Sequence, residues 1–329
     1  MAQPRKWWRW GVNRWIVLLL IILGYLAARA YPPIQPHVQL PAETLSAAPL
    51  FTIPGVGPIF LTNSLVATLL ADVILLAIGF GVLRATRGGR LEIKGFSSAV
   101  EALLEMLYNL AESTAGKWAR HIFPWMATIV MLVLVANWME LIPGVDSIGI
   151  LHHAEGEGYV AQELAPGVAA VVRQTPAEGQ PGYGIIPFVR AAATDLNFTL
   201  ALALISVTFT QFYGIRAGGL GYFGKFFNVK TLFNKPIFGA IDFGVGLLEI
   251  ISEISKILSF TFRLFGNIFA GSVLLFVIGT LVPVFAQTPF LMLEFFVGLI
   301  QAIVFGLLTL VFMAQATAGH GHGEAAHAT

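Results

Sequence analysis

Long apolar segments alternate with polar connections along most of the chain. Five apolar runs stand out, at residues 63–83, 122–142, 194–215, 237–282 and 290–316. Each run has the roughly 20 residues that a helix needs to cross the hydrocarbon core of a bilayer. The pattern therefore predicts an all-α, polytopic membrane protein whose membrane domain covers residues 63–316.

An N-terminal segment, residues 1–30, is expected to be either a sixth membrane helix or a signal peptide. Tryptophan and basic residues are interleaved over residues 1–15, as in an interfacial anchor, and an apolar run follows at 16–28. The run is short for a membrane span, and the Ala-Arg-Ala sequence at its end is also typical of a signal-peptidase site. Both alternatives stay open, with six membrane segments if the helix is retained and five if it is cleaved.

The polar connections differ in charge, and the difference orients the chain. Lysine and arginine cluster in residues 84–94 and 216–236, whereas the proline-rich outer-side segment 31–62 has neither. The loop at 144–193 has only two basic residues. Because cytoplasmic loops carry the excess of basic residues, we expect both termini in the cytoplasm, including a flexible tail at 317–329.

A shorter amphipathic stretch lies at residues 97–117. Ser98-x-x-Glu101 fits a helix capping box, and Val100 and Leu107 belong to an apolar face with i, i+3, i+4, i+7 spacing. The glutamates of this stretch lie off that face. The pattern predicts a helix that lies along the membrane surface instead of crossing it.

Composition and charge exclude most other classes of protein. Hydrophobic residues make up 57% of the chain and charged residues 11%, against about 25% charged in soluble domains. The net charge of +1 creates no field for nucleic acid, and the absence of cysteine rules out disulfides and thiolate metal sites. The glycine-rich run 219–225 lacks the preceding strand and the following Ser or Thr of a phosphate-binding loop. The few histidines give no convincing metal site, so we expect no cofactor, metal or nucleotide.

Segment 237–282 is too long for an upright span. Its 46 residues would extend about 70 Å as a helix, so the segment either breaks or lies strongly tilted. Glu249, Lys256 and Arg263 recur at steps of seven and share one helix face. Polar residues thus follow this segment along much of its length, which is unusual within a membrane.

An arginine in the middle of this segment needs a partner. A charge at the bilayer centre costs about 2.5 to 17 kcal/mol, and the upstream acids Glu249 and Glu253 lie roughly 21 and 15 Å from Arg263 along a continuous helix. The partner must therefore come from another helix or another chain. Asp72, inside segment 63–83, is likewise expected to face protein or water.

The residues around this arginine resemble a known signature. The run Arg263-Leu-Phe-Gly-Asn267-x-x-Ala-Gly is similar to that of the subunit a family of rotary F-type ATP synthases. The resemblance covers roughly residues 60–316, without much of the loop at 144–190. Further polar positions of the family are matched by Glu249-x-x-Ser252, Gln301, Asp195-x-Asn197 and Asn137-x-x-Glu140.

The resemblance implies a non-catalytic, ion-translocating stator subunit in a bacterial plasma membrane. Its partners would be the c-ring, subunit b of the peripheral stalk, the rest of the synthase complex and membrane lipid. Two long, strongly tilted helices would face the c-ring, and Arg263 would meet the carboxylate of each passing c subunit. The guanidinium would favour the ionised carboxylate and separate two aqueous half-channels.

The resemblance, with the orientation given by the charges, also assigns the half-channels. Glu249 and Ser252 would belong to the inner one, and Asn267, Glu294 and Gln301 to the outer one. Polar residues near the outer surface would line its mouth or its walls, namely Glu140, Asp195 and Asn197.

One position departs from the family pattern. The ninth residue after the arginine is often Glu or His, whereas here it is Ser272, which we expect to face Glu294. Because serine does not titrate near neutral pH, Glu294 would carry the outer relay largely alone or with water.

Two other functions compete with this interpretation. A secondary ion transporter would also carry charges within the membrane, but no internal repeat is visible in the sequence. A structural membrane scaffold would have no need for a stripe of charges along one helix.

Overall fold

The computed structural model is mainly helical. It describes residues 10–30, 41–46, 48–55, 57–86, 95–142, 144–153, 158–172, 174, 176, 180–226, 236–281 and 287–318. Its long helices are α1 (Trp10–Ala30), α2 (Asn63–Thr86), α3 (Phe96–Ala115), α4 (Ala119–Glu140), α5 (Leu196–Gly218), α7 (Pro236–Leu281) and α8 (Gln287–Thr317). The basic cluster beyond Thr86, most of the basic connection before α7 and the C-terminal tail after 318 lie outside the described residues.

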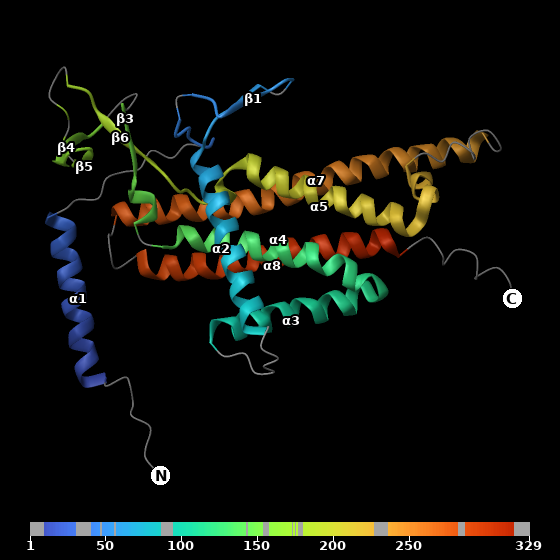
Figure 1. Cartoon of the computed structure of the whole chain (residues 1–329), viewed down its shortest axis with the longest axis horizontal. Helices are drawn as coiled ribbons and strands as arrows, with labels where there is room; N and C mark the ends of the chain where they lie inside the picture. The colour runs from blue at the N-terminus through green and yellow to red at the C-terminus, as the bar shows by residue number, and fades with distance from the viewer. Residues whose placement is uncertain are drawn as a thin grey trace, which may run out of the picture.

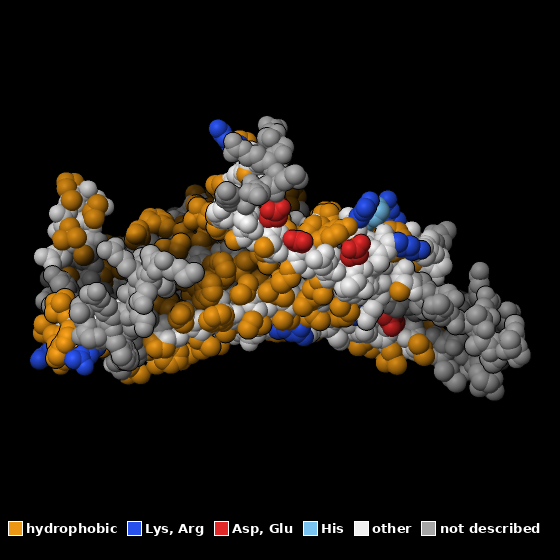
Figure 2. Space-filling view, turned by 90° about the horizontal axis from the view of Figure 1, so that it is seen from below, with side chains coloured by type: hydrophobic (Ala, Val, Ile, Leu, Met, Phe, Trp, Pro, Cys, Tyr) orange, Lys and Arg blue, Asp and Glu red, His pale blue; other side chains and the backbone are white. Residues whose placement is uncertain are grey.

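Five helical stretches are long and apolar enough to cross a membrane, and they confirm the predicted fold class. They are α2, the continuous α3–α4 stretch, α5, α7 from Phe243 onward, and α8. The apolar part of α1 is shorter, at Asn13–Leu26. Hydrophobic side chains also cover much of the outer surface, seen from below in Figure 2. A surface of this kind suits contact with lipid.

Helices α4, α5, α7 and α8 pack side by side into the main body of the protein (Figure 1). Buried apolar side chains from α3, α4, α5, α7 and α8 form one continuous core, with Met126, Val130, Leu264, Leu310 and Met313 among its largest members. Helix α2 crosses this body and packs on α4 through the small residues Ala67 and Ala71. Helix α1 is drawn apart from the body in Figure 1.

Helix α7 is unbroken over its 46 residues. The alternative of two upright spans separated by a break is therefore wrong. Helix α8 has 31 residues and returns antiparallel beside α7 (Figure 1). Both helices run across α2 instead of along it, as expected of helices that are strongly tilted in the membrane.

Three short antiparallel strand pairs occupy the connections at one side of the body, at the top of Figure 1. Strand β1 (Phe51–Ile53) pairs with β2 (Gly57–Ile59), β3 (Gly149–His153) with β6 (Tyr183–Pro187), and β4 (Val160–Ala165) with β5 (Val168–Val172). These strands were not predicted from the sequence. Their common side is the one that charge assigned to the exterior.

The capping box predicted at Ser98 and Glu101 is wrong. Helix α3 begins at Phe96, and its N-cap is Gly95, whose φ of 81° lies in the left-handed region and which makes no side-chain capping hydrogen bond. The predicted apolar face is present, since Val100 and Leu107 are buried together with Ala111. The stretch is therefore an amphipathic helix, as predicted, although the predicted capping box does not form its start.

Candidate functional site

Arg263 lies on the exposed side of α7. Buried Phe260, Leu264 and Ile268 recur at steps of four and fix the opposite side of the helix against the core. The guanidinium Nη2 donates a hydrogen bond to Ser259 Oγ at 3.1 Å. Within the described residues, Arg263 forms no ion pair with a carboxylate. Its charge is therefore available to a group outside this chain.

A pocket of about 350 Å³ adjoins Arg263. It extends from the guanidinium toward the predicted inner half of α7 and is lined by hydroxyl groups on one side and by α8 side chains on the other. The lining residues are Ser252, Ser255, Lys256, Ser259, Phe260, Arg263, Leu308 and Phe312. Ser252, which the sequence placed in the inner half-channel, thus shares a pocket with Arg263.

Lys256 is paired within its own helix. Its Nζ donates to Glu253 Oε1 at 2.8 Å and lies 4.9 Å from the centre of the Phe312 ring. This pair was not predicted from the sequence, although its i, i+3 spacing was a usable signal. Glu249, one turn before Glu253, is half-buried on the same helix.

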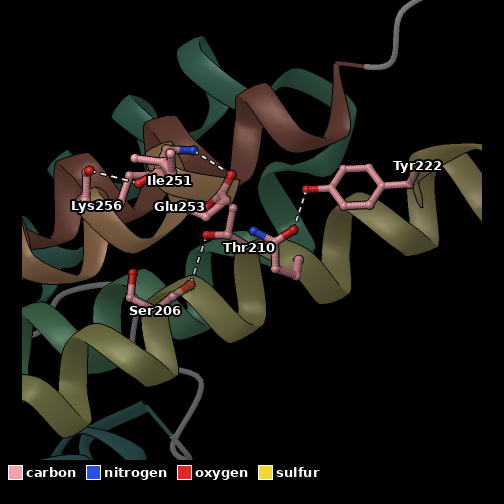
Figure 3. Close-up of polar contacts among 8 residues, drawn as sticks. Ser206, Thr210, Tyr222, Ile251, Glu253 and Lys256 are labelled. Atoms are coloured by element: carbon pink, nitrogen blue, oxygen red, sulfur yellow. Dashed lines mark hydrogen bonds and ion pairs between the residues drawn. The ribbon is translucent and has the colours of Figure 1, made fainter. Parts of the chain in front are cut away.

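Polar groups of α5 lie beside this part of α7 (Figure 3). Thr210 donates to the Ser206 carbonyl at 2.9 Å, and Tyr222 donates to Gln211 Oε1 at 2.7 Å. Glu253 is only 9% exposed. The predicted inner half of the protein therefore contains a buried polar region to which both α5 and α7 contribute.

A second polar group joins three helices near the outer end of the body. The Ser272 hydroxyl of α7 donates a hydrogen bond to the carboxylate of Glu140, the last residue of α4. The Glu294 carboxylate of α8 packs against Gly271, where a β-carbon would overlap it. Three predicted residues, Glu140, Ser272 and Glu294, thus come together from distant parts of the sequence. The hydrogen bond of Ser272 goes to Glu140, and not to Glu294, which the family resemblance placed opposite it.

Asn137 and Trp138, near the end of α4, hold this helix against α8. Asn137 is 3% exposed, and its Nδ2 donates to the Gly298 carbonyl at 3.3 Å. The Trp138 indole donates to the Phe295 carbonyl at 3.2 Å and stacks on the Phe295 ring at 4.5 Å between centroids. These contacts fix the position of the Glu140 carboxylate relative to Glu294.

Asp195 has a clear structural task. It is 8% exposed, accepts a hydrogen bond from Ser64 Oγ at 2.6 Å, and caps α5 by accepting from the Asn197 backbone at 2.9 Å. The contact with Ser64 ties the start of α5 to the start of α2. Asn197 itself is exposed.

The remaining predicted residues, Asn267 and Gln301, are placed by their helices alone. Asn267 is exposed one turn after Arg263, and Gln301 is half-buried two turns after Glu294. Neither side chain makes a hydrogen bond to the described part of the chain. Their amides are therefore free to bind water or a partner chain.

A titratable group outside the membrane helices lies in the short turn that follows α4. Burial raises the pKa of Asp146 from 3.8 to about 6, and the charge of Arg190 opposes the shift. The turn leads directly into β3, which pairs with β6.

Within the described residues, no group of three His, Asp or Glu side chains could hold a metal ion.

Comparisons with known proteins identify the family of the chain. The profile of the family described as ATP synthase A chain matches residues 65–314. Three bacterial proteins named ATP synthase subunit a are similar to the chain. That of Campylobacter concisus is 30% identical over 174 residues, covering 52% of this chain and 54% of the relative. Those of Campylobacter jejuni and Alteromonas mediterranea are 31% and 28% identical, over 55% and 59% of this chain and 58% and 64% of the relatives. The matches span about half to two thirds of these relatives.

Proposed function

Since the chain belongs to the ATP synthase A chain family, we propose that it is the proton-translocating stator subunit of a rotary ATP synthase in a bacterial plasma membrane. The c-ring, subunit b and the remaining synthase subunits would be its partners. The chain would catalyse no covalent step. Its task would be to deliver protons to the ring carboxylates and to collect them again.

The observation that carries this proposal is the exposed guanidinium of Arg263. It lies within a helix that is apolar enough to span the membrane, and no carboxylate of the described residues pairs with it. Because an arginine cannot deprotonate in a protein, its charge must be met by a group on another chain. A carboxylate that passes along α7 would meet this requirement once in every step of rotation.

The guanidinium would have two effects on that carboxylate. A positive charge nearby favours the ionised form, so the ring carboxylate would release its proton as it approaches Arg263. The same charge would repel a proton that moved directly from one half-channel to the other. Rotation would then be the only route between them.

The outer half-channel would run past the three-helix group of Glu140, Ser272 and Glu294. Glu294 would pass the proton, while the Ser272 hydroxyl would hold Glu140 in place beside it. Gln301 and Asn267 would continue the path along α8 and α7 toward Arg263. Asp195 and Asn197 would support the mouth through the start of α5.

The inner half-channel would use the pocket on the other side of Arg263. Its serine-lined wall, which includes Ser252, offers hydroxyl groups that can bind water beside the guanidinium. Glu249 would lie farther along α7 toward the cytoplasm. Lys256 would hold Glu253 instead of carrying protons.

Purification in mild detergent tests the proposal directly. The tagged chain should bring down the c-ring and the catalytic head, and the purified complex should make ATP when a pH gradient is imposed across reconstituted vesicles. A chain that purifies without these subunits and transports an ion alone would instead be a secondary transporter.

A further inference from the structure

Helix α1 is exposed on every side within the described part of the chain. Its large side chains from Trp15 to Leu26 are each between 37% and 62% exposed, and none of its described side chains is buried. A helix that belongs to a membrane bundle buries one side against neighbouring helices. Helix α1 therefore adds no buried side chain to the described body of the protein.

The apolar part of α1 is also short for a membrane span. Residues Asn13–Leu26 extend about 21 Å as a helix, whereas the hydrocarbon core of a bilayer is about 30 Å thick. A basic N-terminal segment followed by an apolar run of this length is typical of a signal that directs the next segment across a membrane. The length of α1 thus suits a targeting signal better than a permanent span.

The chain that follows α1 is attached to the body by contacts of its own. The Glu43 backbone donates a hydrogen bond to Asn63 Oδ1 at 3.2 Å, and Asn63 Nδ2 donates to Glu43 Oε2 at 3.2 Å. The Asn63 backbone donates in turn to the Glu43 carbonyl at 3.1 Å, and the Leu45 backbone donates to the Leu61 carbonyl at 2.7 Å. Asn63 is fully buried at the start of α2. These contacts would hold the outer segment in place if α1 were removed.

The C-terminal end of α1 carries the residues that such a removal needs. Ala28 and Ala30 are small residues two positions apart, and Ala30 ends the helix. In Figure 1 this end of α1 points toward the side of the strand pairs, which the charges assigned to the exterior. Peptidases that remove secretory signals act on that side of the membrane and require small residues at these two positions.

We propose that a membrane-bound signal peptidase hydrolyses the peptide bond between Ala30 and Tyr31 once α1 has carried the outer segment across the membrane. Water adds across this bond, so that Ala30 gains a carboxylate and Tyr31 a free amine. The last turn of α1 must open to an extended backbone for the cut, and no described side chain of α1 is buried to oppose this. The mature chain then begins at Tyr31 on the outer side, and α2 is its first membrane span.

Mass analysis of the chain in the assembled complex, purified from native membranes, tests this processing step. The N-terminal peptide should begin at Tyr31 with a free amine, and peptides from residues 1–30 should be absent. A chain that begins at Met1 or Ala2 would overturn the proposal, and so would a cut at any other bond. The measurement is independent of proton translocation, so the proposed function can fail without affecting its outcome.

Substitution beside the bond tests the kind of peptidase. Ala30→Leu places a large side chain directly before the cut and should slow the appearance of the chain beginning at Tyr31 by roughly tenfold or more, because only small residues are accepted there. Ala27→Leu makes the same change outside the two required positions and is the matched control, which should be processed at the wild-type rate. Pulse labelling of cells followed by gel separation of precursor and product measures both rates. Equal rates in the two variants, whether fast or slow, would show that this alanine is not read by a signal peptidase.

Discussion

The Ser272 hydroxyl of α7 donates a hydrogen bond to the Glu140 carboxylate of α4. The contact joins residues 132 positions apart in the chain. It gives a serine, which cannot relay protons by titration near neutral pH, a definite role beside Glu294. In the proposed mechanism Ser272 would position a carboxylate, and the carboxylates would carry the proton transfer.

Replacement of Glu294 should therefore impair proton flow more than replacement of Ser272. A positioned proton carrier contributes on the order of 100-fold or more to transfer, so Glu294→Gln should reduce ATP-driven pumping severely. Ser272→Ala removes only a hydrogen bond to Glu140 and should cause a smaller loss. Quenching of a pH-sensitive dye in membrane vesicles measures both. Equal and small losses would mean that the outer path does not pass Glu294.

Replacement of Gly271 should impair proton pumping as strongly as replacement of Glu294, whose carboxylate lies against this glycine. A β-carbon at position 271 would overlap the Glu294 carboxylate, so Gly271→Ala must displace that group. A displacement of about 1 Å can cost roughly 100-fold in a positioned reaction, and we expect a large loss of pumping in a fully assembled complex.

Gly244 provides the matched control on the same helix, because nothing lies within 4 Å of a β-carbon built there. Gly244→Ala should therefore pump at close to the wild-type rate. If Gly271→Ala pumped equally well, Glu294 would have room that the structure does not show, and its assignment as a relay would lose its geometric basis.

Much of this fold could be predicted from the sequence, because membrane helices are encoded locally. Runs of apolar residues gave five spans to within a few residues, and length alone singled out α7. Local signals also existed for two contacts that were missed. The Lys256–Glu253 pair has i, i+3 spacing, and Asp195 precedes an apolar run, which is typical of an N-cap.

Other features depend on tertiary packing, which periodicity does not contain. The bond from Ser272 to Glu140 requires α4 and α7 to lie against each other, and heptad spacing along one helix carries no information about that. The pairing of β3 with β6 joins residues that are at least 30 positions apart, across a stretch rich in turns. The start of α3 depends on the backbone geometry of Gly95, which a capping pattern does not reveal.

Asp146 should make the outer loop less stable as the pH rises. Its pKa is raised from 3.8 to about 6 in the folded loop, so between these values the folded state binds more protons than the unfolded one. The contribution of the protonated Asp146 to the stability of the loop is then fully present below roughly pH 4, and it is lost as the pH rises through about 6. Asp146→Asn should remove this dependence.

Hydrogen exchange of the β3 and β6 amides measures the effect. After correction for intrinsic exchange, protection in the wild-type protein should fall by about tenfold more than in Asp146→Asn between pH 4 and 7, with allowance for solvent screening. Parallel pH profiles would show that the carboxyl is not buried as the structure indicates. The β1–β2 pair, which lies elsewhere in the chain, serves as an internal reference.

The decisive prediction concerns Arg263. Opposite charges attract far more strongly in a desolvated interface than in water, so each ring carboxylate should ionise where it meets the guanidinium. Arg263→Ala should abolish ATP synthesis driven by a pH gradient and abolish ATP-driven pumping, while ATP hydrolysis by the soluble head continues uncoupled. The membrane sector should also leak protons, since the barrier between the half-channels is gone.

Arg263→Lys separates charge from geometry. A compact ammonium keeps a positive charge in water, but it can deprotonate when buried and lacks the planar fork that a carboxylate can bind in two places. We therefore expect Arg263→Lys to lose coupled synthesis as well. Both variants should be measured in reconstituted vesicles, with subunit stoichiometry as the check on assembly. A fully assembled Arg263→Ala complex that made ATP at near the wild-type rate would exclude the guanidinium from the mechanism. Lys256 is the other cation among the residues that line the pocket, and it could not replace Arg263 because it is already paired with Glu253.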